Sequence, residues 1–267
     1  MNLTSFNKWV DTHFHVFNAY EAVKGARYVP QYNAALQDWI ALAQGVGVTR
    51  GVWVQPSFLG TDNSLMLRAL KEHPDVLRGV AVVAVDIHAD ALREMHECGV
   101  RGIRLNLVGL DHDIPEWTHA EHLWQCMHDL GWHLEVHTDT GALTKVLAQL
   151  PTDMPLVVDH MAKPREANAR DATVQALVQR AQQAATHIKL SGAYRLGALN
   201  AASLARLWLD ELGPKSLLWG SDWPCTNHES LANYAELFAA FVAWVGEQHM
   251  DDVLIHNPQR LFWDTGF

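Results

Sequence analysis

Apolar segments with strand character and amphipathic segments with helical character alternate along this chain from one end to the other. Several strand-like segments are apolar almost throughout, as in residues 80–85, which is typical of parallel strands covered on both faces. We predict strands at residues 9–17, 49–56, 77–86, 100–109, 132–139, 154–162, 187–195 and 216–224. The amphipathic stretches between them predict helices at residues 34–45, 64–73, 89–98, 120–130, 142–150, 173–184 and 202–212.

Eight strand–helix units in 267 residues predict an α/β fold, a single (β/α)8 TIM barrel spanning residues 1–267. A doubly wound sheet is the alternative, but such folds more often have fewer strands and a glycine-rich first turn. Neither G-x-G-x-x-G nor G-x-x-x-x-G-K follows a predicted strand, so the sequence does not indicate nucleotide binding. Residues 20–33, after the first strand, form a segment long enough to be a lid over a site.

The amino-acid composition excludes some classes of binding partner for this chain. The formal net charge of −10 argues against binding to nucleic acids or acidic membranes, which requires a basic surface. The three cysteines, Cys98, Cys126 and Cys225, are too widely spaced to suggest a disulfide framework or a thiolate zinc site. Residues 1–8 lack the apolar core of a signal peptide, and no apolar run approaches the length of a membrane span. We therefore expect a cytoplasmic protein that acts on a small molecule.

Side chains suited to acid–base chemistry or metal binding stand at the ends of four predicted strands. They are His13, His15, His137, His160 and Asp222. Because alternate residues of a strand share a face, we expect Asp11, His13 and His15 all to point into the barrel. The carboxyl ends of barrel strands converge on one face, so these groups predict a single active site.

Each of these residues also has a structural interpretation. The H-x-H pair could be two hydrogen-bonded core histidines, and Asp222 could cap a helix or pair with an arginine. His137 could belong to a polar turn. We interpret the other histidines as surface or structural residues, since His133 and His187 begin strands, at the face of a barrel associated with stability.

Basic and hydroxyl side chains gather at the same predicted face. They are Arg104, Lys163, Tyr194 and Arg195, with Gln55 and Ser57 after the second strand. Guanidinium groups favour bidentate recognition of carboxylates, so three cations in an acidic protein suggest a carboxylated substrate. The alternative is that Arg104 pairs with an internal acid such as Asp86 or Glu135, and that Arg195 lies at the rim.

Short motifs distributed over nearly the whole chain resemble the amidohydrolase superfamily, and in particular its lactonase branch. They are V-D-T-H-F-H-V-F (10–17), V-Q-P-S-F-L-G-T-D-N (54–63), G-I-R-L-N-L (102–107), V-D-H-M-A-K-P (158–164), K-L-S-G-A-Y-R (189–195), W-G-S-D-W-P (219–224) and N-P-Q-R-L-F (257–262). The resemblance implies a TIM barrel that hydrolyses a small carboxylated or polyhydroxylated lactone, such as a 2-pyrone-4,6-dicarboxylate-like or sugar-acid lactone.

The resemblance also implies a role for each matching residue. Asp222 would activate water, and His13, His15 and His160 would surround and polarise the lactone carbonyl. Arg104 and Arg195 would hold a substrate carboxylate, with Ser57 alongside. Two positions depart from the pyrone dicarboxylate lactonases of this branch, which have arginine in place of Lys163 and are expected to have histidine in place of Cys225. Both departures weaken the assignment to that particular substrate and leave the expected reaction intact.

Metal dependence is a separate question. Binuclear members of the superfamily need a bridging lysine or glutamate on the fourth strand, where this chain has Arg104 and Asn106. A single Zn²⁺ on His13, His15, His137 and Asp222 is chemically sensible. We favour catalysis without a metal, because the Arg104 guanidinium would oppose a dication and lactones are already activated esters. The alternatives are a metal-dependent decarboxylase of a small unsaturated or aromatic acid, and a non-catalytic barrel that binds a small acid.

Overall fold

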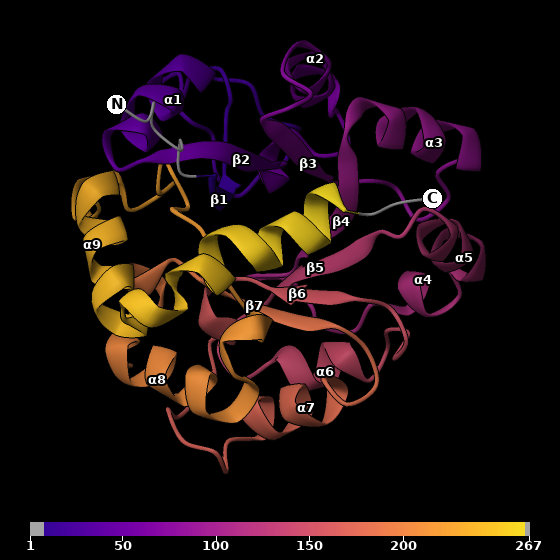
Figure 1. The fold of residues 1–267 in the computed structure, drawn as a ribbon. Coiled ribbons are helices and arrows are strands. Elements are labelled where there is room, and N and C mark those ends of the chain that lie inside the picture. Colours follow the sequence, from indigo (N-terminus) through magenta and orange to yellow (C-terminus); the bar gives the residue numbers. More distant parts are fainter. Residues whose placement is uncertain (1–7, 265–267) are drawn as a thin grey trace.

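Eight parallel strands form one sheet whose spatial order follows the sequence and which closes into a barrel (Figure 1). The computed structural model describes residues 8–264; the segment on which the expectation of no signal peptide rests therefore lies almost wholly outside the described residues. The strands are β1 (Trp9–Phe14), β2 (Val48–Val54), β3 (Leu77–Ala81), β4 (Val100–Asn106), β5 (His133–His137), β6 (Leu156–Val158), β7 (Thr186–Leu190) and β8 (Leu217–Trp219). The eight predicted strands are all present, and each ends a few residues earlier than predicted.

Backbone hydrogen bonds close the barrel between β1 and the residues that follow β8. The amide of Asp222 donates to the carbonyl of His13 at 2.8 Å, and the amide of His15 donates to that of Trp223 at 2.8 Å. Two predicted site residues, His13 and Asp222, thus belong to the closure itself. Their relative position is set by backbone bonds as well as by side chains.

Helices surround the barrel, as Figure 1 shows. They are α1 (Leu36–Gly45), α2 (Ser64–Glu72), α3 (Ala89–Cys98), α4 (Pro115–Thr118), α5 (Glu121–Asp129), α6 (Leu143–Leu147), α7 (Ala172–Arg180), α8 (Ala201–Leu212) and α9 (Tyr234–Val245). The seven predicted helices are present; α4 and α9 were not predicted. Among the residues that the structure describes, no helix combines the length and the apolar character needed to cross a membrane.

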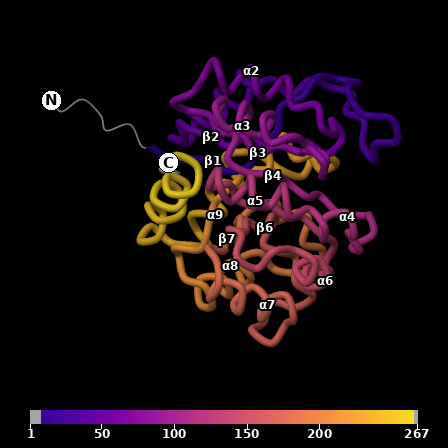
Figure 2. Tube along the Cα trace, turned by 90° about the vertical axis from the view of Figure 1, so that its right-hand side faces the viewer, coloured from indigo at the N-terminus to yellow at the C-terminus, as the bar shows by residue number. Residues whose placement is uncertain are grey.

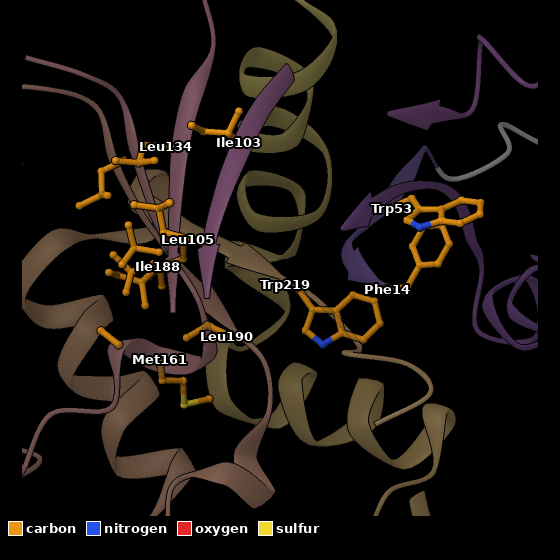
Figure 3. Packing of buried hydrophobic residues seen from close by; sticks show 14 of the residues in the cluster. Phe14, Trp53, Ile103, Leu105, Leu134, Met161, Ile188, Leu190 and Trp219 are labelled. Atoms are coloured by element: carbon orange, nitrogen blue, oxygen red, sulfur yellow. The ribbon is translucent and has the colours of Figure 1, made fainter. Parts of the chain in front are cut away.

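The main core lies between the strands and the helices. Phe14 on β1 stacks on Trp39 of α1, with ring centroids 3.9 Å apart. Trp219 on β8 packs edge-on against Phe238 of α9 at 5.1 Å. Figure 3 shows Phe14 beside Trp53, with Trp219 nearby. Because an aromatic side chain buries a large apolar area, these contacts hold α1 and α9 against the strands that carry the predicted site.

A C-terminal helical segment closes the amino-terminal end of the barrel. Its two turns of π-helix, Asp252–His256 and Gln259–Trp263, are drawn in yellow in Figures 1 and 2. Leu261 and Phe262 pack on apolar side chains from the strands, namely Val10, Val52, Val54, Val80, Val157 and Leu218. In Figure 2 this segment and α4, which follows β4, lie at opposite ends of the molecule. The other end is therefore the one at which the strands finish.

Candidate active site

A cleft of about 720 Å³ lies where the strands finish. Seven of the predicted site residues line it: His15, Ser57, Arg104, His137, His160, Arg195 and Asp222. The lid segment lines it as well, through residues 23–28. Most of the predicted site residues thus meet in one cavity, at the end of a barrel where catalytic groups are usually found.

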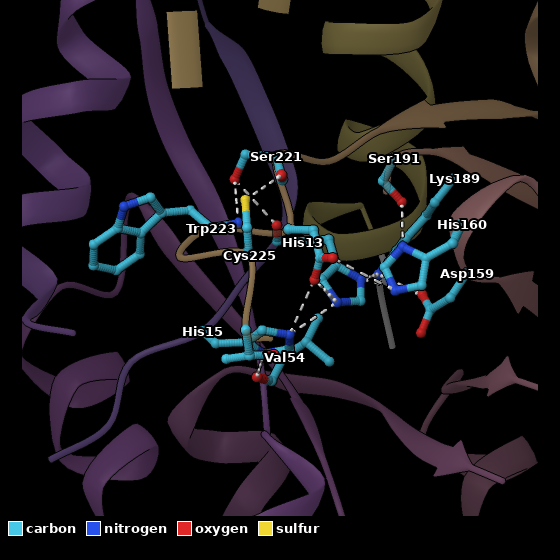
Figure 4. Close-up of polar contacts among 12 residues, drawn as sticks. His13, His15, Val54, Asp159, His160, Lys189, Ser191, Ser221, Trp223 and Cys225 are labelled. Carbon is cyan, nitrogen blue, oxygen red and sulfur yellow. Dashed lines mark hydrogen bonds and ion pairs between the residues drawn. The ribbon is translucent and has the colours of Figure 1, made fainter. Parts of the chain in front are cut away.

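His13, His15 and Asp222 form a tight cluster at the inner end of the cleft. Figure 4 shows the two histidines next to each other. The Nε2 atoms of the two histidines are 3.3 Å apart. Asp222 Oδ1 lies 3.7 Å from His13 Nε2 and 3.4 Å from His15 Nε2. Gly220 makes this approach possible, because a Cβ at that position would lie 2.5 Å from the Cβ of His13.

The hydrogen bonds of the two histidines restrict their tautomers. His15 Nδ1 lies 2.7 Å from the carbonyl oxygen of Val54, so Nδ1 carries the proton and donates it. His13 Nδ1 lies 3.1 Å from the ammonium of Lys189 and 3.1 Å from Asp159 Oδ1. If His13 Nδ1 accepts from Lys189, its Nε2–H donates to His15 Nε2, and every contact in the chain from Lys189 to Val54 joins a donor to an acceptor.

Asp222 has one occupied and one free carboxylate oxygen. Oδ2 accepts hydrogen bonds from the Tyr194 hydroxyl and from Arg195 Nε, each at 2.7 Å. Oδ1 has no hydrogen-bond partner among the described residues. Burial alone would raise the pKa of this carboxyl, but the Arg195 guanidinium outweighs it and holds the pKa well below its usual range. Asp222 is therefore ionised at neutral pH and has a free oxygen at the inner end of the cleft.

A buried ionic network lies beneath this cluster. Arg104 donates from Nε and Nη2 to Asp159 Oδ2, at 3.0 and 2.9 Å, and lies 3.7 Å from Glu135. Lys189 Nζ donates to Glu135 Oε2 at 2.5 Å. Burial and the neighbouring Asp159 raise the pKa of Glu135 to about 7. Arg104 thus pairs with internal acids, as the alternative interpretation held, but chiefly with Asp159; Asp86 is exposed.

His160 is presented by an unusual turn of backbone. Beyond the end of β6, four successive residues, His160, Met161, Ala162 and Lys163, have φ values of 50, 57, 60 and 42°. The left-handed region costs an L-residue about 1–2 kcal/mol. The turn places His160 Nδ1 2.9 Å from Ser191 Oγ, and a Cβ at Gly192 would lie 2.6 Å from that nitrogen. His160 is thus held by a turn and not by the strand that was predicted to carry it.

The prediction for Asp11 is wrong. Its carboxylate accepts hydrogen bonds from Trp39 on α1 and Tyr234 on α9, each at 3.0 Å, so it faces the outer helices. Register shifts in β1, one of them between Asp11 and Phe14, interrupt the alternation of faces on which the prediction depended. Asp11 also accepts from the hydroxyl and the amide of Ser221, at 2.6 and 2.9 Å, and so supports the loop that carries Asp222.

Several predicted residues lie outside the cleft lining. His13 is fully buried behind His15, and the Tyr194 hydroxyl is bonded to Asp222. Lys163 is 8% exposed and does not line the cleft, and the Gln55 amide donates to the carbonyl of Asp62. These placements suit positioning residues better than residues that touch a substrate.

The described residues contain two groups that could hold a metal ion: His13, His15 and Asp222, and His13, Asp159 and His160. His137 joins neither; its ring packs edge-on against that of His160 at 4.4 Å, so the predicted four-ligand set is not brought together. Tetrahedral Zn²⁺ with bonds of about 2.1 Å needs donor atoms about 3.4 Å apart, which the first group approaches. That donor set therefore fits a single divalent ion.

Sequence reasoning missed three residues of the site, Asp159, Lys189 and the lid residue Arg27, which lines the cleft. Lys189 carried a readable signal, since a lysine between Ile188 and Leu190 in a buried strand requires a partner. Asp159 directly precedes His160 at the end of the same predicted strand, and only the histidine was assigned to the site. No pattern in the sequence indicates where Arg27 lies.

His133, at the start of β5, provides a test of stability against pH. Burial lowers the pKa of its imidazole from 6.5 to about 3, and neither ring nitrogen has a hydrogen-bond partner among the described residues. Between these pH values the unfolded chain binds one proton more than the folded protein, so the stability due to neutral His133 is lost as pH falls below 6.5. His133→Phe should flatten the dependence of the unfolding free energy on pH between 6 and 4 by about 1.4 kcal/mol per pH unit. Urea denaturation across this range measures the slope, and an unchanged slope would contradict the assignment.

Comparison with known proteins places the chain in a family. Residues 10–263 match the model of the amidohydrolase family. The chain belongs to that family. It is 29% identical to a 2-pyrone-4,6-dicarboxylate hydrolase of Comamonas testosteroni, over 95% of this chain and 90% of the relative. It is 26% identical to a 4-sulfomuconolactone hydrolase of Hydrogenophaga intermedia, over 94% and 88%.

The fold and the resemblance seen in the sequence are confirmed by a solved structure. A probable 2-pyrone-4,6-dicarboxylic acid hydrolase of Acinetobacter baumannii, with citric acid bound, has a TM-score of 0.85 and 34% identity to this amidohydrolase. The match covers 96% of this chain and 99% of that one. The curated relatives are hydrolases of lactones, which supports the prediction of an enzyme that acts on cyclic esters.

Proposed function

We propose that this amidohydrolase is a lactonase that opens a small lactone bearing carboxylate groups. The observation that carries the proposal is the buried, ionised Asp222, whose free Oδ1 lies in a cleft that four cationic side chains also line. The relatives named for hydrolysis of 2-pyrone-4,6-dicarboxylate and of 4-sulfomuconolactone, and the citric acid bound by the structural neighbour, support an anionic substrate.

Asp222 acts as the general base in this proposal. Because Arg195 and Tyr194 occupy Oδ2, the proton of the attacking water passes to Oδ1. The water oxygen bonds to the lactone carbonyl carbon, and the bond from that carbon to the ring oxygen then breaks. Protonated Asp222 returns its proton to the departing ring oxygen, which regenerates the base. The product is the ring-opened hydroxy acid, which has the atoms of the lactone plus one water.

His160 is the proposed donor to the carbonyl oxygen. Burial lowers the pKa of its imidazole to about 3, so the ring is neutral at neutral pH. If the Ser191 hydroxyl donates to Nδ1, the proton of His160 is on Nε2, which is 3.9 Å from Asp222 Oδ2. A neutral N–H donor at this place stabilises the oxyanion that develops on the carbonyl. His13 and His15 form the buried wall beside Asp222 Oδ1, at 3.7 and 3.4 Å.

The inner carboxylate of the substrate is assigned to Arg104 and Arg195. Each uses one edge of its guanidinium on an internal acid, Asp159 or Asp222, and both also line the cleft. Nη1 of each guanidinium makes no hydrogen bond with a described residue and can donate to a carboxylate, whereas Arg195 Nη2 donates to the carbonyl of Thr226 at 3.1 Å. Ser57, whose oxygen lies 3.3 Å from Asn106 Nδ2, adds a hydroxyl donor in the same cleft. Lys163 is not assigned a contact with substrate.

We further propose that turnover requires no metal. The Lys189–His13–His15–Val54 chain provides hydrogen-bond partners for the histidine nitrogens without a metal ion. The positive charges of Arg104 and Lys189 would also repel a metal cation bound nearby. When bound to His13, His15 and Asp222, a single Zn²⁺ would supply Lewis acidity and lower the pKa of a bound water. The binding of substrate by Arg104 and Arg195 would be the same in both cases.

Metal removal tests this part of the proposal. After exhaustive dialysis against EDTA, with residual zinc and manganese below one-tenth equivalent by elemental analysis, kcat should stay within about twofold of its initial value. Re-addition of Zn²⁺ should not increase it. A loss of activity that Zn²⁺ restores would assign the His13–His15–Asp222 group to a catalytic ion.

The substrate class is tested with a panel of lactones. Purified protein, shown to be folded by circular dichroism, should hydrolyse acidic pyrones and muconolactones faster than neutral aldonolactones, as followed by ring absorbance and by proton release. Inactivity across the whole panel would contradict the proposal. Release of CO₂ from an aromatic or unsaturated acid, dependent on metal, would indicate the decarboxylase alternative instead.

A further inference from the structure

The cationic side chains of the cleft fall into two kinds. The inner pair, Arg104 and Arg195, is neutralised by the buried carboxylates Asp159 and Asp222. The outer pair, Lys24 and Arg27, comes from the lid segment and lines the same cleft. Neither forms an ion pair or a side-chain hydrogen bond with any residue that the structure describes. The outer pair therefore presents positive charge that no described residue contacts in an ion pair.

Arg27 reaches across the cleft to the loop after β4. A Cβ at Gly109 would lie 3.4 Å from Nη1 of Arg27, which is the nearest atom outside the adjoining residues. Gly109 is itself fixed, because its amide donates to Asp139 Oδ2 at 2.8 Å. The guanidinium thus lies over a backbone without a side chain, on a residue that is exposed as a whole. Its outer surface remains available to a ligand.

The backbone that carries Arg27 is anchored on both sides. The next residue, Tyr28, donates its hydroxyl to Glu229 at 2.8 Å, and Tyr32 donates to the same oxygen at 2.9 Å. On the other side, the amide of Val23 donates to the carbonyl of Phe58 at 2.8 Å. Glu229 lies in the loop between β8 and α9, which also carries Asp222. The lid segment is thus tied to the loop of the proposed base, and the position of Arg27 is defined relative to the cleft.

Acidic groups do not satisfy Arg27 within the cleft. Glu116 and Asp222 are the acidic side chains among the described residues that line it. Asp222 is buried and bonded to Arg195, and Glu116 is exposed and makes no ion pair with Arg27 within 4 Å. An unpaired guanidinium at the wall of a cleft is suited to bidentate binding of an incoming carboxylate or sulfonate.

We propose that Arg27 is a specificity-determining residue that binds a second anionic group of the substrate, at the outer end of the cleft. This inference rests on the proposed lactonase function and adds a requirement to it. The preferred lactone carries one carboxylate for the inner arginines and another anionic group farther from the reacting carbonyl. Arg27 acts on affinity and not on the chemical step, because the reacting atoms lie beside Asp222.

Binding of stable ring acids tests the inference without catalysis. Isophthalate carries two carboxylates on a flat ring, and benzoate carries one. By titration calorimetry, the unmodified protein should bind isophthalate more tightly than benzoate. Arg27→Gln should weaken isophthalate binding by about tenfold, the usual effect of losing a charge-assisted hydrogen bond, and change benzoate binding by less than about twofold. Arg27→Lys should give an intermediate loss.

A matched control is Arg206→Gln, which removes the same charge from an exposed position on α8 outside the cleft. It should leave both affinities unchanged. Equal effects of Arg27→Gln on the two acids, no effect on either, or no preference of the unmodified protein for isophthalate would each overturn the inference.

Kinetics separates this inference from the proposed function. With a dicarboxylated lactone, Arg27→Gln should raise KM by about tenfold and leave kcat within about twofold, and with a monocarboxylated lactone it should change neither. Hydrolysis of lactones with no selective effect of Arg27→Gln would reject Arg27 alone. Selective loss of isophthalate binding in a protein that hydrolyses none of the lactones would reject the lactonase and keep the anion site.

Discussion

Replacing Asp222 by asparagine should lower kcat by roughly 10²–10⁴-fold, the usual contribution of a positioned general base. Asparagine keeps the shape of the side chain and can still accept the hydrogen bonds of Tyr194 and Arg195. It removes the carboxylate whose Oδ1 is free. Because the inner carboxylate of the substrate is assigned to Arg104 and Arg195, KM should change little. Steady-state kinetics on the preferred lactone of the panel separates the two effects.

Tyr194→Phe is the matched control for this variant. It removes one hydrogen bond to Oδ2 and leaves Oδ1 and the charge in place, so kcat should fall by about tenfold or less.

The pKa of Asp222 lies well below its usual range, and the base should therefore remain ionised when the pH falls to 5. Near-normal turnover by Asp222→Asn would show that the base is another group, with His160 the next candidate.

Replacing Lys189 by methionine should destabilise the protein by about 3–5 kcal/mol, because it leaves the buried Glu135 without its hydrogen-bonded counterion, while Asp159 keeps Arg104. Lys189 is fully buried, and its ammonium lies 2.5 Å from Glu135, 3.1 Å from His13 and 3.7 Å from Asp159. Methionine has similar length and volume, so the lost charge and hydrogen bonds account for the change. Urea denaturation followed by tryptophan fluorescence measures it.

The double variant Lys189→Met with Glu135→Leu is the informative control. Removing both members of a buried ion pair is often neutral or stabilising, so the double variant should recover much of the stability that the single variant loses. Activity should not recover with stability, since His13 Nδ1 would still lack its donor. If the single and double variants were equally unstable, packing and not charge would explain the role of Lys189.

The barrel could be predicted from the sequence because its strands are continuous apolar runs, and parallel strands buried on both faces require them. Their ends could not, since β7 and β8 pass into irregular segments that look equally extended in the sequence. Arg195 and Asp222 were placed on those strands and lie beyond them. The two side chains nevertheless lie close together, as expected. A residue just past the end of a strand still faces the same end of the barrel.

Residue type was enough to indicate Asp222, His15 and His160, since few positions of a barrel combine such groups with strand ends. The ion-pair partner of Arg104 could not be predicted. Arg104 was expected to bind substrate, with pairing to Asp86 or Glu135 as the alternative, and Asp159 occupies one edge of its guanidinium. Asp11 was assigned to the wrong face, because a register shift in β1 leaves no trace in the pattern of apolar and polar residues.

The left-handed turn at His160–Lys163 constrains how this protein can evolve or be engineered. Each of its four residues disfavours valine, isoleucine and threonine for steric reasons, whatever the chemistry of the reaction, while glycine and asparagine are tolerated. A library randomised across these positions should therefore lose many members at the folding step. The folded variants would be those whose residues tolerate the left-handed conformation. Among them, only variants that keep histidine at position 160 could be assayed for lactone hydrolysis.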